Sequence, residues 1–178
     1  MKIGLVRHFK VKCKPKQKWL YLRQFYEWIE AYDNSEILYP NNFGYNDSWD
    51  ICFSSDLRRA KLTAEFIFDG LIIKTKDLRE VDIIELKNIG IKMHYIILLI
   101  INRVLWFISG KLQDKNIQHT IARAKNFLDI IETSEYSKVL IVSHGLFMKF
   151  LDKELKQRKY RGKMELIPKN GKIIIYDK

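Results

Sequence analysis

Three short apolar runs divide the chain, and each ends in a cluster of polar residues. The runs cover residues 2–6, 50–54 and 138–142, and they are rich in β-branched and aliphatic side chains. Such runs are typical of buried strands. Polar residues stand at the end of each run: Arg7 and His8, then residues 54–56, then residues 143–145. The pattern predicts three buried strands with chemistry at their carboxyl ends.

Helical periodicity separates these strands. Apolar residues recur at helical spacing in four segments, and a further apolar run at 71–76 predicts another strand. Serine and aspartate before the second helix are N-cap residues, so we expect that helix to begin near Asp56. Lys169-Asn170-Gly171-Lys172 between two apolar runs predicts a hairpin. The expected helices cover residues 19–32, 57–68, 120–131 and 146–155.

Alternation of strands and helices indicates the class of fold. Strands that alternate with helices form a mostly parallel sheet with helices on both faces. The sequence therefore predicts an α/β fold, a three-layer α/β/α sandwich, as one domain over residues 1–178.

The most apolar part of the chain lies at residues 89–108. Its longest uninterrupted apolar run is short, and Asn102 and Arg103 interrupt it, whereas a membrane span needs about 20 apolar residues. We expect a buried helix that ends at Ser109-Gly110 and a lid over the site at about 89–110. Contact with a membrane surface is the alternative, without stable insertion.

Charge narrows the choice of ligand. The formal net charge is +11, from 32 basic and 21 acidic residues. This excess favours an anionic partner, and no nucleic-acid-binding motif accompanies it. Cys13 and Cys52 lack metal-ligand spacing, and Met1 leads directly into a strand without a signal peptide. The expectation is a cytoplasmic protein with a phosphorylated small molecule as partner and no nucleic acid.

The polar clusters fit phosphoryl chemistry. Carboxyl ends of parallel strands meet at one edge of a sheet, where ligands bind. Two histidines and two arginines can converge there. Guanidinium groups match phosphate oxygens, one imidazole can accept the phosphoryl group, and the other can donate to an oxygen on which charge develops.

Four blocks of sequence resemble the histidine phosphatase superfamily, the phosphoglycerate-mutase-like fold. They occur in order and at workable spacing: Leu-Val-Arg-His at 5–8, Ser-Ser-Asp-Leu-Arg-Arg-Ala-Lys-Leu-Thr-Ala at 54–64, Leu-Arg-Glu-Val-Asp at 78–82 and Val-Ser-His-Gly at 142–145. The resemblance implies a phosphoric monoester hydrolase of the histidine acid type that needs neither metal nor cofactor. It also implies a role for each matching residue: His8 as the phosphorylated nucleophile, Arg7 and Arg59 as the phosphate clamp, His144 as the second pocket histidine, and Glu80 as the general acid.

Nearby residues match less well or depart from the family. Arg58 is expected to face solvent, and His94 and His119 match none of the motifs. The family has glycine after the first histidine, where this chain has Phe9. Either phenylalanine can adopt the turn or the pocket is narrower. A lysine-rich loop at 10–18 replaces the family's threonine and asparagine, and Ile83-Ile84 stand where a glycine is expected.

These departures leave several functions open. The short chain favours a phosphatase over a phosphomutase. A protein of the same fold that binds phosphorylated ligands with weak or no catalysis is a second class. A basic peripheral protein that uses residues 95–108 at a membrane is a third. Aromatic residues near the expected lid suit a phosphosugar, a nucleotide or a phosphopeptide equally well.

Overall fold

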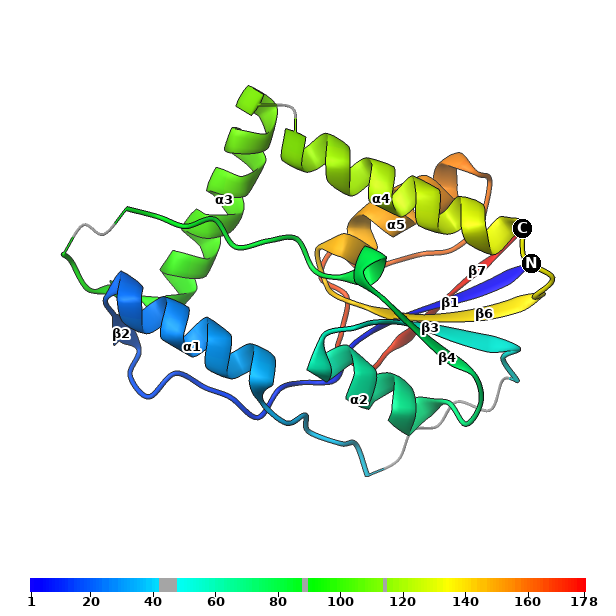
Figure 1. The fold of residues 1–178 in the computed structure, drawn as a ribbon, viewed down its shortest axis with the longest axis horizontal. Helices are drawn as coiled ribbons and strands as arrows, with labels where there is room; N and C mark the ends of the chain where they lie inside the picture. Colours follow the sequence, from blue (N-terminus) through cyan, green and yellow to red (C-terminus); the bar gives the residue numbers. More distant parts are fainter. Residues whose placement is uncertain (42–47, 88–89, 114) are drawn as a thin grey trace.

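A five-stranded sheet forms the centre of the computed structural model, which describes residues 1–41, 48–87, 90–113 and 115–178 (Figure 1). The strand order is β4-β3-β6-β1-β7. Neighbouring strands pair in parallel except β7, which pairs antiparallel with β1. The prediction of a mostly parallel sheet is therefore confirmed. The strands are β1 (Lys2–Arg7), β3 (Ile51–Ser55), β4 (Ile72–Thr75), β6 (Lys138–Ser143) and β7 (Ile173–Asp177).

Alternating side chains of the strands fill two cores, one on each face of the sheet. On one face, Ile3 and Leu5 of β1 pack in the core beneath α4 (Lys115–Glu132) and α5 (Phe147–Gln157). On the other face, Val6 packs with the alanines of α2 (Arg58–Ile67). Because successive strand residues point to opposite faces, apolar runs without alternation require cover on both sides. The three-layer α/β/α sandwich is confirmed.

Two further helices lie beside one another at one side of the sheet (Figure 1). They are α1 (Leu22–Asn34) and α3 (Tyr95–Gln113), which share a small apolar core that includes Phe25 and Leu98. Short strands β2 (Trp19–Leu20) and β5 (Met93–His94) pair at their base. The helix expected from residue 19 begins three residues later because Trp19 and Leu20 join this ladder.

Helix α3 passes through the break that we expected at Ser109-Gly110 and continues to Gln113. A serine and a single glycine therefore do not end this helix, since the packing of its buried side chains holds it in place. None of the helices in the described ranges is long and apolar enough to cross a membrane.

The predicted start of the second helix near Asp56 is close to the observed one, but Asp56 does not cap the helix. Helix α2 begins at Arg58, and its N-cap residue Leu57 makes no side-chain capping hydrogen bond. Asp56 instead accepts two hydrogen bonds of 2.6 Å from Arg79, which directly follows the 3₁₀ helix η1 (Lys76–Leu78). The Asp56 carboxylate thus forms a bidentate, charge-assisted pair with a residue distant in sequence and does not cap α2.

The predicted hairpin at residues 169–172 is also wrong. Gly171 has a φ of 72°, which favours glycine, and it turns the chain into β7. However, the continuous pairing of β7 is with β1, and an isolated antiparallel bridge between Arg161 and Asp177 joins it to the preceding segment. The prediction of a turn at Gly171 is confirmed, and the strand that pairs with β7 is β1, at the opposite end of the sequence.

Candidate active site

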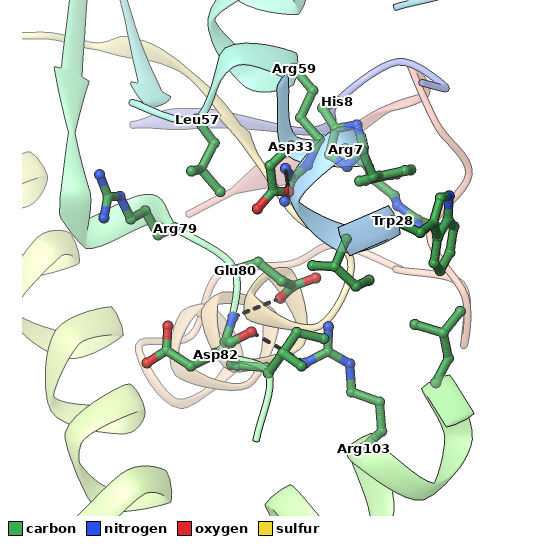
Figure 2. A pocket seen from close by; sticks show the side chains of 15 residues that line it. Arg7, His8, Trp28, Asp33, Leu57, Arg59, Arg79, Glu80, Asp82 and Arg103 are labelled. Atoms are coloured by element: carbon green, nitrogen blue, oxygen red, sulfur yellow. Dashed lines mark hydrogen bonds and ion pairs between the residues drawn. The ribbon is translucent and has the colours of Figure 1, made fainter. Parts of the chain in front are cut away.

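The carboxyl ends of β1, β3 and β6 meet at one edge of the sheet, as parallel pairing requires. The backbone N–H of His8 donates to the carbonyl of Ser143 over 3.0 Å, which joins two of the predicted clusters directly. A cavity of about 480 Å³ opens at this edge (Figure 2). Four of the predicted site residues line it: Arg7, His8, Arg59 and Glu80. The fifth, His144, lies buried against His8, with ring centroids 5.1 Å apart.

His8 has one ring nitrogen fixed by the backbone. Its Nδ1 lies 2.6 Å from the carbonyl oxygen of Phe9. Since a carbonyl can only accept, Nδ1 carries the proton and the lone pair is on Nε2. Burial, the positive charge of Arg59 and that of Arg7 together lower the pKa of His8 to about 3, against the opposing effect of the hydrogen bond with the Phe9 carbonyl. His8 is therefore a neutral imidazole at physiological pH.

His144 is buried like His8. Its Nε2 lies 2.8 Å from the hydroxyl of Ser55, and its Nδ1 has no hydrogen-bond partner among the described residues. Burial lowers the pKa of His144 well below its ordinary value, with Arg59 the next cause. The sequence pattern indicates no role for Ser55, although this residue stands in one of the strand-end clusters. In the fold it holds the second histidine in place.

Two guanidinium groups face this edge. Arg59 is 5% exposed, and the ring of Tyr32 lies 5.4 Å from its guanidinium carbon. The Nε atoms of Arg59 and Arg7 are buried without a hydrogen-bond partner among the described residues. An unpaired buried donor is costly, so an anion that accepts from both groups would be stabilised here. The adjacent Arg58 is exposed and pairs with Glu36, in agreement with its expected place in solvent.

A carboxylate that the sequence did not indicate contacts this clamp. Asp33, at the end of α1, forms an ion pair with Nη1 of Arg59 and lines the same cavity. A phosphate dianion that approaches Nη1 of Arg59 would compete with this carboxylate, because like charges repel at close range. Arg103 of α3 lines the cavity as well and donates to the Val81 carbonyl over 3.2 Å.

Glu80 is held at the N-terminus of α5. Its two carboxylate oxygens accept from the backbone N–H groups of Leu146, at 3.1 Å, and Phe147, at 2.9 Å. It also accepts from the N–H of Val81 at 3.1 Å (Figure 2). Backbone donors at a helix N-terminus attract a negative charge. Glu80 thus lines the cavity while its oxygens bind the protein backbone.

Phe9 adopts the turn after His8 without a positive φ, since the described backbone has only one such non-glycine residue, Lys159. Its ring points away from the cavity, packs edge-on against Phe66 and fills the space beside Gly171. Of the two explanations for Phe9, the structure supports a turn that phenylalanine can adopt. The lysine-rich loop contributes no residue to the cavity lining.

A segment distant in sequence supports the backbone of Arg7 and His8. Asn170 Nδ2 donates to the His8 carbonyl over 2.6 Å, and the Gly171 N–H donates to the Arg7 carbonyl over 2.8 Å. Arg7 in turn donates from Nη1 to the carbonyl of Pro168 over 3.0 Å. These contacts fix the end of β1, and with it the direction of both functional side chains.

Stability should depend on pH through the two buried histidines. In the unfolded chain a histidine takes up a proton near pH 6.5, whereas folded His8 does so only near pH 3. Between these values the unfolded chain binds more protons, so the free energy of unfolding decreases as the pH falls. Each histidine contributes a slope of up to about 1.4 kcal/mol per pH unit. Urea denaturation from pH 7 to pH 5 measures this slope, and His8→Gln should reduce it. Equal stability at both pH values would contradict the neutral, buried state.

Metal-ligand clusters are not present in the described part of the chain: nowhere in it do three or more His, Cys, Asp or Glu side chains come together to hold an ion.

Solved structures of phosphatases share this fold. The phosphoserine phosphatase of Entamoeba histolytica, in complex with 3-phosphoglyceric acid, aligns with a TM-score of 0.61 at 19% identity, over 98% of this chain and 89% of that chain. The alpha-ribazole phosphatase of Shigella flexneri aligns with a TM-score of 0.58 at 16% identity, over 99% and 90%. At such low identities the likeness establishes the fold alone.

Sequence comparison identifies the family. A search of curated proteins finds no match to this chain. The family model described as the histidine phosphatase superfamily (branch 1) matches residues 45–177. That range includes Arg59, Glu80 and His144 and begins after Arg7-His8, which the fold brings to the same edge of the sheet. The resemblance seen in the sequence is confirmed, and this chain belongs to the histidine phosphatase superfamily.

Proposed function

We propose that this protein is a phosphomonoesterase that works through a phosphohistidine at His8 and needs no metal ion. The observation that carries the proposal is the state of His8. Its Nδ1–H is held by the Phe9 carbonyl, so the Nε2 lone pair is available beside the Arg7 and Arg59 guanidinium groups. A neutral imidazole next to a cationic clamp suits attack on a phosphate dianion.

In the first step, Nε2 of His8 attacks phosphorus and the bond from phosphorus to the leaving oxygen breaks. The guanidinium groups of Arg7 and Arg59 and a hydrogen bond donated by His144 offset the charge on the phosphoryl oxygens. A protonated Glu80 gives its proton to the leaving oxygen, which departs as an alcohol. In the second step, water attacks phosphorus, the P–N bond breaks with its electron pair returning to Nε2, and Glu80 accepts the proton of the water.

Glu80 has to release an oxygen from the α5 backbone before it can serve as this acid. Glu80→Gln keeps an acceptor for the helix N–H groups but cannot exchange a proton. We expect it to lower kcat for glycerol phosphate by about 10²–10³-fold. With p-nitrophenyl phosphate, whose leaving group needs no proton, we expect a burst of nitrophenolate followed by slow turnover. Stopped-flow absorbance measures the burst.

Asp82→Asn is the matched control, because Asp82 lines the same cavity and is exposed. It should behave like the wild-type protein with both substrates. Equal slowing of the two substrates in Glu80→Gln, with no burst, would remove Glu80 from the acid–base role.

The proposed substrate is a small phosphorylated metabolite. The structural neighbour from Entamoeba histolytica binds 3-phosphoglyceric acid, a small phosphate monoester. The cavity of this chain favours an anionic ligand, because four arginines line it: Arg7, Arg59, Arg79 and Arg103. Both cysteines are free thiols, Cys52 buried, which suits a reducing compartment such as the cytoplasm.

The test is release of phosphate from p-nitrophenyl phosphate between pH 5 and pH 8 with EDTA present. Wild-type protein should turn over, and native mass spectrometry of the reacting protein should show one added phosphoryl group. Absence of turnover together with thermal stabilisation by vanadate would instead indicate a binding protein. Transfer of the phosphoryl group to a second substrate molecule rather than to water would indicate a mutase.

A further inference from the structure

Helix α3 presents a continuous apolar face to solvent. Ile96, Ile100 and Val104 follow one another at helical spacing, and Ile100 is 56% exposed. Ile97, Phe107 and Ile108 flank them on the same side and are also exposed. Single exposed apolar residues are ordinary, but a contiguous face on one helix marks an interaction surface.

The opposite face of α3 is anchored, so this exposure is a fixed feature of the fold. Leu98 and Trp106 are buried. Asn102, fully buried between them, donates from Nδ2 to the Ile84 carbonyl at 2.7 Å and accepts from the Ile84 N–H at 3.1 Å. The rotation of the helix about its axis is thereby set, and the apolar face cannot turn inward without breaking these contacts.

This apolar face borders the active-site entrance. A second cavity, of about 340 Å³, is lined by Phe107 of α3 and by Leu166 and Ile167. Leu166 and Ile167 are 83% and 71% exposed. The cavity shares Arg7, Glu80 and Arg103 with the cavity at His8. Exposed apolar side chains from two distant segments therefore line this second cavity.

Positive charge accompanies the apolar surface. The sequence has no acidic residue from 86 to 113, a range that contains Lys87, Lys92 and Arg103. Lys87 and Lys92 are exposed. The lysine-rich loop reaches the same end of the helix, because the N–H of Tyr95 donates to the Lys18 carbonyl over 2.9 Å. Lysine heads at the edge of an apolar face suit anionic headgroups above an apolar layer.

We propose that the exposed face of α3, with Leu166 and Ile167, docks on an anionic lipid bilayer. The helix lies in the interface and does not cross it, as its length and apolar content require. A second copy of the chain suits this face less well. Symmetric pairing would bring two uncompensated basic segments together, with no acidic residue in 86–113 to pair with them. On the bilayer, the cavity entrance lies at the level of the headgroups.

Sedimentation with vesicles tests this proposal. Wild-type protein should bind vesicles of phosphatidylcholine with phosphatidylglycerol and bind pure phosphatidylcholine vesicles more weakly. Part of the binding should survive high salt, where attraction between exposed charges is screened. The double variant Ile100→Glu/Val104→Glu should bind the vesicles at least about tenfold more weakly than the wild-type protein, because two apolar side chains are lost and two negative charges are added.

Ile130→Glu is the matched control, since Ile130 is also 56% exposed but lies on α4. It should bind vesicles like the wild-type protein, and circular dichroism should show all variants folded. Equal binding by wild-type protein and the double variant, or no binding by either, would overturn the proposal. The proposal would also be overturned if light scattering showed that the wild-type protein is a dimer and the double variant a monomer. Hydrolysis of p-nitrophenyl phosphate in solution is an independent readout of the catalytic site.

Discussion

Replacing His8 by alanine is expected to lower kcat for p-nitrophenyl phosphate by at least about 10⁴-fold. The variant removes the only group proposed to bond to phosphorus, while the buried neighbours Arg59 and His144 remain to bind phosphate. Without the nucleophile, water must attack the ester directly, and unassisted hydrolysis of phosphate monoesters is among the slowest of biological reactions. Steady-state kinetics and mass spectrometry of the reacting protein should show lost turnover and no phosphoryl adduct.

His94→Ala is the control for this experiment. His94 stacks on Tyr95 at the base of α3 and does not line the cavity. It should retain wild-type turnover. If His8→Ala kept turnover within tenfold of wild type, the covalent mechanism would be wrong even if the protein proved to be a phosphatase. Vanadate should still stabilise His8→Ala against heat, because the guanidinium clamp is intact.

The second large effect is expected at Arg59. Arg59→Met keeps the length and apolar contacts of the side chain but removes its charge and donors. We expect kcat/KM to fall by about 10³-fold, the upper end of the loss for one oxyanion donor. The variant also frees Asp33, whose carboxylate then stands beside the phosphate without its partner. Phosphate inhibition constants, measured alongside kcat/KM, should increase in parallel.

Arg58→Met provides a neighbouring comparison on the same helix. Arg58 is exposed, pairs with Glu36 and faces away from the cavity. An exposed ion pair contributes about 1 kcal/mol or less to stability, so this variant should keep near wild-type kinetics. Similar losses in the two variants would mean that general positive charge, and not the position of Arg59, attracts the substrate.

The strand ends could be predicted because the relevant information is local. Residues 2–6 and 138–142 are apolar without alternation, which requires cover on both faces and hence a central, parallel position. Once the strands are parallel and adjacent, His8 and His144 must share one edge. Their convergence follows from topology, even though 135 residues separate them in the sequence. For this reason four short blocks sufficed to indicate the fold and the family.

Features that depend on distant partners could not be predicted in this way. The cap expected at Asp56 was lost to Arg79, which the pattern of residues 54–64 cannot reveal. Asp33 directly follows the helix predicted over residues 19–32, and only the packing of α1 beside α2 brings it onto Arg59. The exposure of Ile100 depends likewise on which face of α3 is anchored by Asn102. Apolar periodicity indicates a helix, but not which of two apolar faces is covered.

The support of Arg7 by Gly171 and of His8 by Asn170 has a consequence for synthesis. During translation, Pro168, Asn170 and β7 emerge more than 150 residues after His8, the proposed nucleophile. Translation at about 5–20 residues per second leaves β1 with an unpaired edge for many seconds. If the proposed activity is correct, the nascent chain should be unable to hydrolyse phosphate esters until residues 168–177 have emerged. Nascent-chain complexes stalled before residue 168 should be inactive, and the exposed edge of β1 is where a chaperone would be needed.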